Sequence, residues 1–216
     1  MSRNAVRIEK ERLLDIIKNE RIQAAVEAAE NAFLRAQINP HFLFNTLSYI
    51  HHHVNRHSTE AADAIIQLSE IMRYALNVSH EEGFVRIGTE MDQVEKLLNL
   101  HQMRRPTMMH VHIDVDEQAK DVMFIPLVLL TLAENMIKYA DFNLPDHPAT
   151  LLVACDEKRL TIRSTNLINP NPMAESNGKG LQNILSRLQH SYIEKLAYQH
   201  HIRENTFEIE IYLDLS

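Results

Sequence analysis

The most informative stretch of this sequence is Gln37-Ile38-Asn39-Pro40-His41-Phe42-Leu43-Phe44-Asn45. Proline cannot donate the interior hydrogen bond of a helix, so Pro40 is expected to kink the surrounding helix or to restart it. His41 and Asn45 are then neighbours one turn apart on the same helical face. Taken alone, a histidine on a helix is more often a solvated surface residue than a functional one, and on the residues alone that interpretation stays open.

The segments on either side of this stretch have the apolar spacing of long helices. From about residue 5 to residue 56, apolar residues recur at steps of three and four among charged ones. A helix of roughly 50 residues would be about 75 Å long, which is too long to be buried within one small domain. It therefore predicts a partner helix, a parallel coiled coil and a homodimer. Ser58 is placed to cap a second helix, so residues 1–86 are expected to form a coiled coil and a helical hairpin that dimerises as a four-helix bundle.

The pattern changes near residue 87, where strands begin to alternate with helices. We expect helices at 91–103, 127–140 and 181–192, and strands at 108–115, 150–156, 159–166, 197–203 and 206–215. Strands interspersed with helices that cover one face are typical of a two-layer α/β sandwich. Residues 87–216 are therefore predicted to form a second domain of this kind, which makes the fold class α+β.

Composition excludes several classes of function. The 216 residues carry a formal net charge of −7, which argues against direct nucleic-acid binding because such binding needs a basic surface. Cys155 is the only cysteine of the sequence, so neither an intrachain disulfide nor a cysteine-based metal cluster can form. No segment reaches the ~18 consecutive apolar residues of a membrane helix, and no signal peptide is visible, so the chain as given is expected to be cytoplasmic.

Two short segments in the second half carry polar residues suited to phosphate chemistry. In Leu132-Ala133-Glu134-Asn135-Met136-Ile137-Lys138-Tyr139, an acid, an amide and a base lie in an apolar helix. The spacing of Glu134 and Lys138 is also that of an ordinary surface ion pair. In Asn177-Gly178-Lys179-Gly180-Leu181-Gln182-Asn183, glycines precede a predicted helix, whose first backbone N–H groups could face an anion. A Gly-x-Gly pair by itself is weak support, because a plain loop-to-helix turn would also explain it.

Together, these segments resemble the LytS-like sensor histidine kinases over residues 20–215. The Asn39–Asn45 block is similar to the phosphoacceptor block of that family. The segment around Asn135 resembles the N-box of the Bergerat-fold ATPases, and Gly178–Asn183 with Arg187-Leu188 resembles their G-box. The resemblance implies a dimeric kinase whose Bergerat-type sandwich binds ATP with Mg²⁺. It also implies transfer of the phosphoryl group to an aspartate of a response regulator, and attachment to a membrane only through a sensor segment outside this chain.

The resemblance further implies roles for individual residues. His41 would accept the phosphoryl group, and Asn45 would orient water for the reverse dephosphorylation. Asn135 would ligate Mg²⁺, with Glu134 orienting water or metal and Lys138 approaching the phosphates. The loop from about residue 168 to residue 177 would be the ATP lid. The other residues expected around the nucleotide are Tyr139, Asn166, Gly178, Gly180 and Leu181.

Three positions depart from the usual pattern of the family. Related kinases have an Asp-x-Gly-x-Gly block whose aspartate bonds the adenine, and Asn166 is the candidate substitute for that aspartate here. Tyr139-Ala140 replaces the usual His-Gly, and Phe42 follows the histidine where commoner kinases have an acid. These departures leave open a non-catalytic dimeric signalling module that binds nucleotide weakly. An ATPase without a histidine acceptor is also conceivable, but it does not account for Asn39–Asn45.

Overall fold

The computed structural model describes residues 39–78, 83–172 and 179–215. The chain divides into two compact units, residues 1–49 and residues 50–216. The predicted N-terminal coiled coil lies outside the described residues. The helices are α2 (Pro40–Val54), α3 (Thr59–Val78), α4 (Ile87–Met103), α5 (Glu117–Lys120), α6 (Val128–Tyr139) and α7 (Lys179–Ser191). The strands are β1 (Val85–Arg86), β2 (Val111–Val115), β3 (Met123–Phe124), β4 (Ala149–Cys155), β5 (Arg159–Leu167), β6 (Leu196–Arg203) and β7 (Thr206–Asp214).

A helix begins at Pro40, one of the two outcomes expected at this proline. Asn39 caps it, because its side-chain Oδ1 accepts the backbone N–H of Phe42 at 3.2 Å and its carbonyl accepts that of Leu43 at 3.1 Å. Proline suits the first helical position, where its missing N–H would have no intrahelical partner. The residues Asn-Pro therefore set the start of α2 one residue before His41.

The second helix, α3, is capped by Ser58, as predicted from the sequence. The Ser58 Oγ accepts the backbone N–H of Ala61 at 3.1 Å. This helix packs on α4 within the second unit, and the Lys96 ammonium lies 2.8 Å from the Glu70 carboxylate across that contact. Helix α3 is thus joined to the elements that follow it, and the predicted domain boundary between residues 86 and 87 stays a prediction.

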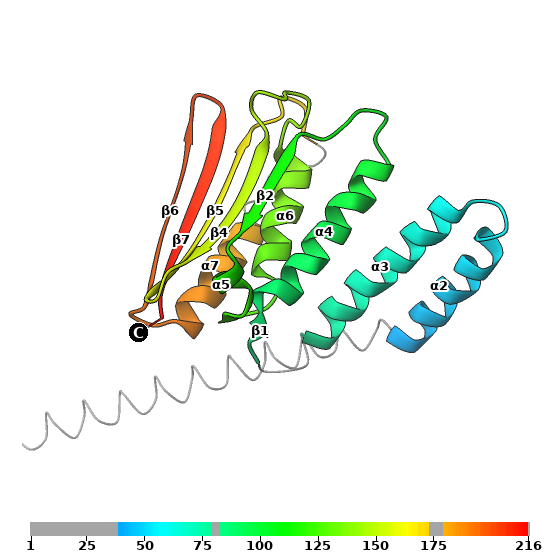
Figure 1. The fold of residues 1–216 in the computed structure, drawn as a ribbon, viewed down its shortest axis with the longest axis horizontal. Coiled ribbons are helices and arrows are strands. Elements are labelled where there is room, and N and C mark those ends of the chain that lie inside the picture. Colours follow the sequence, from blue (N-terminus) through cyan, green and yellow to red (C-terminus); the bar gives the residue numbers. More distant parts are fainter. Residues whose placement is uncertain (1–38, 79–82, 173–178, 216) are drawn as a thin grey trace, which may run out of the picture. The chain divides into compact units, whose positions relative to one another are not determined.

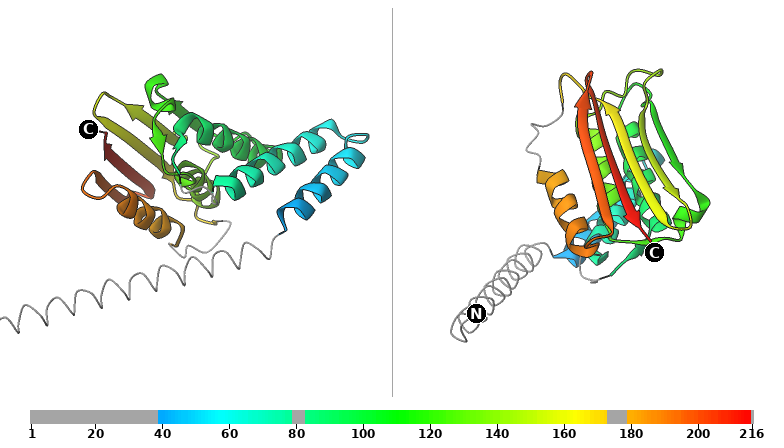
Figure 2. Two further views of the ribbon diagram at one scale, coloured as in Figure 1. Left: turned by 90° about the horizontal axis from the view of Figure 1, so that it is seen from below. Right: turned by 90° about the vertical axis from the view of Figure 1, so that its left-hand side faces the viewer.

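The second unit contains the two-layer sandwich expected from the sequence. Its five-stranded sheet has the order β2-β4-β5-β7-β6, with β2 and β4 parallel and the other neighbours antiparallel. Figure 1 shows α4, α6 and α7 on one face of this sheet. In the right-hand view of Figure 2 the strands lie in front and these helices behind them. The α+β fold class is therefore confirmed.

Alternation along the strands explains why the sheet has one covered face. Successive side chains of a strand point to opposite faces. The buried apolar residues therefore alternate along the central strands, as Leu151 and Val153, Leu160 and Ile162, and Ile209 and Ile211 do. These side chains form one core with the apolar faces of α4, α6 and α7. The largest fully buried side chains are Phe124, Phe142, Ile87, Leu129, Leu132, Met136, Leu151, Leu160, Ile162, Ile184, Leu188 and Ile209.

The other face of the sheet carries a polar network around Glu210. This carboxylate is 5% exposed and accepts hydrogen bonds from Arg163 Nε at 2.6 Å, from the Tyr212 hydroxyl at 2.7 Å and from Gln199. The hydrogen bonds from Tyr212, Gln199 and Arg163 together hold the pKa of Glu210 below its ordinary value. The network satisfies the carboxylate on the sheet face that the helices leave uncovered.

Some local features could not be anticipated from apolar spacing. β1 and β3 form a two-residue antiparallel pair, Val85 with Phe124 and Arg86 with Met123, and the short helix α5 precedes β3. The predicted helix from residue 127 begins instead at Val128, because Leu127 has a left-handed backbone with φ 68°. Among the described residues, none of the helices combines the length and the apolar character needed to span a membrane.

Candidate nucleotide and phosphoacceptor sites

His41 and Asn45 lie side by side near the start of α2. The Asn45 amide nitrogen is 3.3 Å from Nδ1 and 3.4 Å from Nε2 of the His41 ring, so it contacts the imidazole from the next helical turn. Both residues are exposed, and the Phe42 side chain beside them is 70% exposed. A large reactant can therefore reach the ring nitrogens, and an apolar surface is available for its contact.

Helix α6 carries the second group of predicted residues. Its buried face comprises Leu132, Ala133 and Met136, which places Asn135 half-buried between the core and the surface. Glu134 and Lys138 form an ion pair of 3.4 Å, and each side chain is 46% exposed. This pair matches the ordinary surface interaction that their spacing also allowed, and in this conformation Lys138 points to Glu134.

Asn135 and Gly180 meet although they come from different motifs. A methyl group built on Gly180 would lie 3.5 Å from Asn135 Oδ1 and 3.9 Å from the methyl group of Thr131. The first turn of α7 therefore lies directly against the polar side of α6. Because Gly180 has no side chain, it does not cover the Asn135 amide oxygen, which lies beside the first turn of α7. The backbone N–H groups of a first helical turn have no partners within their own helix, so they suit an anion.

The ends of α6 and β5 are also joined. The backbone N–H of Asn169 donates to the Tyr139 carbonyl at 2.8 Å, and that of Asp141 donates to the Leu167 carbonyl at 2.9 Å. Asn166 is buried at this end of β5, and its amide nitrogen donates to the Leu167 carbonyl at 2.9 Å. Asn166 and Tyr139 therefore occupy adjoining segments, as a shared nucleotide pocket would require.

The remaining predicted residues are only partly described. Leu181 is half-buried and packs against the core at the start of α7. Gly178 and most of the proposed lid, residues 173–177, lie outside the described residues. The structure thus brings Asn135 together with Gly180. It also brings the end of α6, which includes Tyr139, together with the end of β5. His41 and Asn45 belong to the first unit.

One buried charged residue was not predicted to have a role. Glu90 of α4 is 0% exposed, and its Oε1 accepts the backbone N–H of Leu130 in the first turn of α6 at 3.1 Å. Burial raises the pKa of Glu90 to about 7, although the hydrogen bond from Leu130 acts in the opposite direction. From α7, Arg187 donates to the Pro126 carbonyl at 2.8 Å. A carboxylate among the apolar positions of a helix was the sequence signal for this arrangement.

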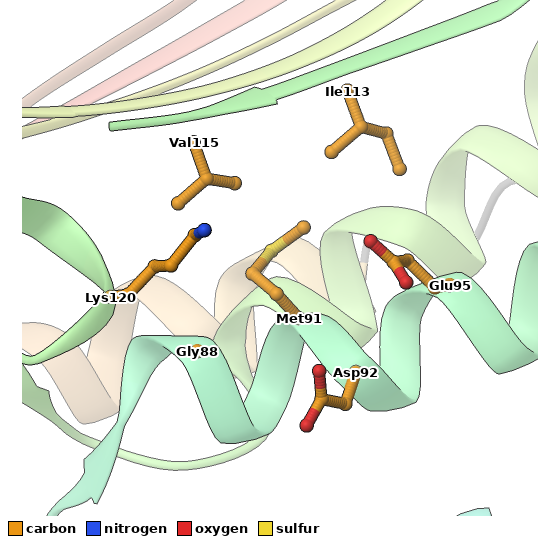
Figure 3. A pocket seen from close by; sticks show the side chains of 7 residues that line it. All are labelled: Gly88, Met91, Asp92, Glu95, Ile113, Val115 and Lys120. Atoms are coloured by element: carbon orange, nitrogen blue, oxygen red, sulfur yellow. The ribbon is translucent and has the colours of Figure 1, made fainter. Parts of the chain in front are cut away.

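A cavity of about 460 Å³ opens between α4, β2 and α5, away from these motifs. Figure 3 shows the side chains of Ile113 and Val115 on the strand opposite Met91 on the helix, with the Lys120 side chain extending beside Val115. Lys120 is paired with Glu117 at 2.6 Å. None of the residues predicted to bind nucleotide lines it. The lining residues are Gly88, Met91, Asp92, Glu95, Ile113, Val115 and Lys120.

Comparison with known proteins identifies the relatives of this chain. Residues 29–109, which include His41 and Glu90, match the family model described as Histidine kinase. The chain is similar to Sensor protein LytS of Staphylococcus epidermidis, with 37% identity over 115 residues, which are 53% of this chain and 19% of that protein. It is also similar to Sensor protein LytS of Oceanobacillus iheyensis, with 32% identity over 123 residues, 57% of this chain and 21% of that protein.

A third relative is Sensor histidine kinase/phosphatase LytS of Staphylococcus aureus, with 34% identity over 115 residues, 53% of this chain and 20% of that protein. Among solved structures, the histidine kinase domain of the blue-light activated histidine kinase EL346 from Erythrobacter litoralis has a TM-score of 0.47 and 11% identity, and the match covers 82% of this chain and 94% of that one. The alignments with the LytS proteins cover about a fifth of the length of those curated relatives.

Proposed function

Since this chain belongs to the LytS-like sensor histidine kinases, we propose that it transfers the γ-phosphoryl group of ATP to His41. From there the group passes to an aspartate of a response regulator. The observation that supports this proposal most is the contact of Gly180 with Asn135, because it joins two polar motifs from distant parts of the sequence in one place. The exposed imidazole with its amide neighbour supports the acceptor role of His41.

The chemistry needs little covalent help from the protein. A nitrogen of the His41 ring attacks the γ-phosphorus, and the bond from that phosphorus to the oxygen bridging to the β-phosphate breaks. ADP leaves with the bonding electron pair, and the imidazole N–H proton passes to water. Such transfers depend on in-line positioning and on neutralisation of phosphate charge. Asn45 would orient a water molecule for the reverse dephosphorylation, a role supported by its amide nitrogen lying 3.3 Å from the His41 ring.

The surroundings of Asn135 fit a Mg²⁺ ion that is held mainly by phosphate and water. Its amide oxygen is the hard donor that Mg²⁺ prefers, and Gly180 leaves the space beside that oxygen free of a side chain. Among the described residues, no group of three or more His, Cys, Asp or Glu side chains could hold a metal. The bound ion would supply charge neutralisation, while Glu134 orients water or metal and Lys138 approaches the phosphates after leaving its ion pair. Tyr139, Asn166, Gly178 and Leu181 complete the proposed nucleotide site.

Labelling with γ-³²P-ATP and Mg²⁺ tests the proposal. We expect labelled protein whose label is stable in alkali and lost in acid, because phosphohistidine is acid-labile and phosphoserine is not. Label that survives acid would place the phosphate on a different residue type. A protein that stays unlabelled at saturating ATP would contradict the kinase activity.

The alternative is a dimeric signalling module that transfers no phosphate. The comparisons with known proteins do not favour this alternative. The one observation that agrees with it is that the Asn166 amide nitrogen donates to the neighbouring Leu167 carbonyl rather than being presented to a base. Titration with a fluorescent ATP analogue separates the two functions. The kinase requires saturable, Mg²⁺-dependent binding, whereas the signalling module requires weak binding or none.

Asn135→Ala is expected to weaken Mg²⁺-dependent nucleotide binding by about 1–3 kcal/mol, because the metal then loses its proposed protein ligand. Titration of the fluorescent analogue with Mg²⁺ and with EDTA measures this loss. Gly180→Ala is the matched variant, since its methyl group would fit beside Asn135 without a clash but would cover the amide oxygen. If Asn135→Ala binds as tightly as the unmutated chain under both conditions, Asn135 is not a metal ligand.

We further propose that the chain forms a homodimer through its helical hairpin. Ile66 and Leu68 of α3 are 41% and 42% exposed, so α3 presents apolar surface that the described residues of one chain leave uncovered. Ile66→Asp should dissociate the dimer, because a buried carboxylate without a partner costs several kcal/mol. Ile202→Asp, on the edge strand β6, is the matched control and should leave the dimer intact. Light scattering that gives the mass of one chain for the unmutated protein would contradict the proposal.

A further inference from the structure

Helix α6 begins without a cap of its own. Leu127 precedes it with a left-handed backbone and no side-chain hydrogen bond to the helix. The backbone N–H groups of a first helical turn need partners from elsewhere. Glu90 provides one from α4, because its Oε1 accepts the Leu130 N–H at 3.1 Å. The position of α6 is therefore tied to a side chain from another helix.

Helix α3 packs on α4 close to Glu90. The Glu70–Lys96 contact of 2.8 Å lies one turn before Tyr74 on α3 and less than two turns after Glu90 on α4, which places Tyr74 and Glu90 toward the same end of this helix contact. Burial and, after it, the Glu90 carboxylate raise the pKa of Tyr74. Both the Tyr74 hydroxyl and Glu90 Oε2 are buried, and within the described part of the chain neither reaches a partner in hydrogen-bond geometry. Buried polar atoms without partners are uncommon and unfavourable, so a small approach of α3 toward α4 that completes this bond is favourable.

Glu90 thus stands between α3 and the helix that carries Asn135. Asn135 lies five residues after Leu130, which is about 7.5 Å along a rigid helix axis. On its other side, the start of α6 is held by the hydrogen bond from Arg187 of α7 to the Pro126 carbonyl. A shift of the first turn of α6 therefore changes where Asn135 stands relative to Gly180.

We propose that Tyr74 and Glu90 form a positioning relay, through which the placement of α3 sets the start of α6 and with it the position of Asn135. Neither residue touches nucleotide. The relay rests on the proposed function because Asn135 is taken as the Mg²⁺ ligand. It connects the helix that follows His41 in the hairpin with the nucleotide site through one hydroxyl and one carboxylate.

Tyr74→Phe is the test, because it removes a single oxygen and keeps the ring. Hydrogen exchange should become about fivefold faster at the Leu129 and Leu130 amides, the response expected when a capping interaction is weakened. Affinity for the fluorescent ATP analogue should fall about threefold with Mg²⁺ and stay unchanged with EDTA. If the Tyr74 side chain contributes only packing, removing its unpartnered hydroxyl will leave the nucleotide affinity unchanged and will leave hydrogen exchange at Leu129 and Leu130 unchanged or slower. Either result would refute the relay.

Tyr212→Phe is the matched control. It also removes a tyrosine hydroxyl that faces a glutamate, since Tyr212 donates to Glu210 at 2.7 Å on the opposite face of the sheet. Exchange at Leu129 and Leu130 and the Mg²⁺-dependent affinity should not change in this variant. Acceleration at Leu129 and Leu130 in both tyrosine variants would indicate a general loss of stability and would count against the relay.

A double-mutant cycle adds a second criterion. In a Glu90→Leu background, Tyr74→Phe should have no further effect, because the relay is already interrupted. Additive effects would show that Tyr74 acts independently of Glu90 and would refute the relay. If the Glu90→Leu chain does not fold, hydrogen exchange in the Tyr74→Phe variant alone decides.

Failure of the relay can be distinguished from failure of the proposed function. If the unmutated chain binds nucleotide equally with and without Mg²⁺, the proposed role of Asn135 fails. Hydrogen exchange at Leu130 still tests the link between α3 and α6 in that case.

Discussion

Replacing His41 with glutamine is expected to abolish labelling by γ-³²P-ATP completely. Glutamine has a similar reach but lacks a ring nitrogen that can attack phosphorus, so no step of the transfer can occur. Nucleotide affinity should remain within about twofold, because His41 belongs to a different unit of the chain from Asn135 and effects at separate sites are independent. Phosphorimaging of the denatured protein and titration of the fluorescent analogue measure the two quantities.

His52→Gln is the matched control for this experiment, since His52 is an exposed histidine of the same helix. It should be labelled as strongly as the unmutated chain. Label that persists on His41→Gln would remove His41 from its proposed role and would direct attention to the histidines at the end of α2, which are His51, His52 and His53.

Glu90 should make the stability of the chain depend on pH. Burial raises the pKa of Glu90 from 4.5 to about 7 in the folded chain, so the folded state binds this proton more tightly than the unfolded state does. Its contribution to stability is therefore fully present below about pH 4.5 and is lost as the pH rises through about 7. Over that range the free energy of unfolding should decrease by about 3 kcal/mol on account of this one carboxyl group.

Glu90→Gln isolates the contribution of Glu90 from those of other titrating groups. Glutamine stays neutral and can still accept the Leu130 N–H, so urea unfolding should show the variant close to the unmutated chain near pH 4.5 and more stable above pH 7. The same substitution at Glu95, an exposed residue of α4, is the matched control for replacing a carboxyl group with an amide on this helix. Parallel pH profiles for Glu90→Gln and the unmutated chain would mean that Glu90 is not protonated on folding.

The fold could be predicted from the sequence where the signal was local. Alternation in 150–156 and 159–166 predicted β4 and β5 within one residue at each end, because one face of each strand is buried. Ser58 was identified as a cap from its position before an apolar stripe. The pair β1–β3 was missed, because strands of two residues have no period to detect.

In the candidate sites, contacts within one helix could be predicted from the sequence, but contacts between helices could not. The neighbouring positions of His41 and Asn45 follow from helical spacing alone, whereas the contact of Gly180 with Asn135 depends on how α7 packs on α6. The role of Glu90 could not be derived from the sequence, because its partner Leu130 is 40 residues away and offers only a backbone N–H group. Glu134 and Lys138 form the surface pair that their spacing allows, and their proposed roles stay predictions.

The connections of the sheet determine the order in which the nucleotide site can form. β2 and β4 pair in parallel with α6 between them in sequence, and α7 lies between the neighbouring strands β5 and β7. A parallel pair needs a crossover and cannot close as a hairpin, while β4–β5 and β6–β7 can form locally. Contacts between distant segments form late because they carry the entropy cost of closing long loops. During synthesis, Asn135 and Gly180 can therefore reach their final places only after β7 has left the ribosome. A chain shortened so that it lacks β7 should not bind nucleotide.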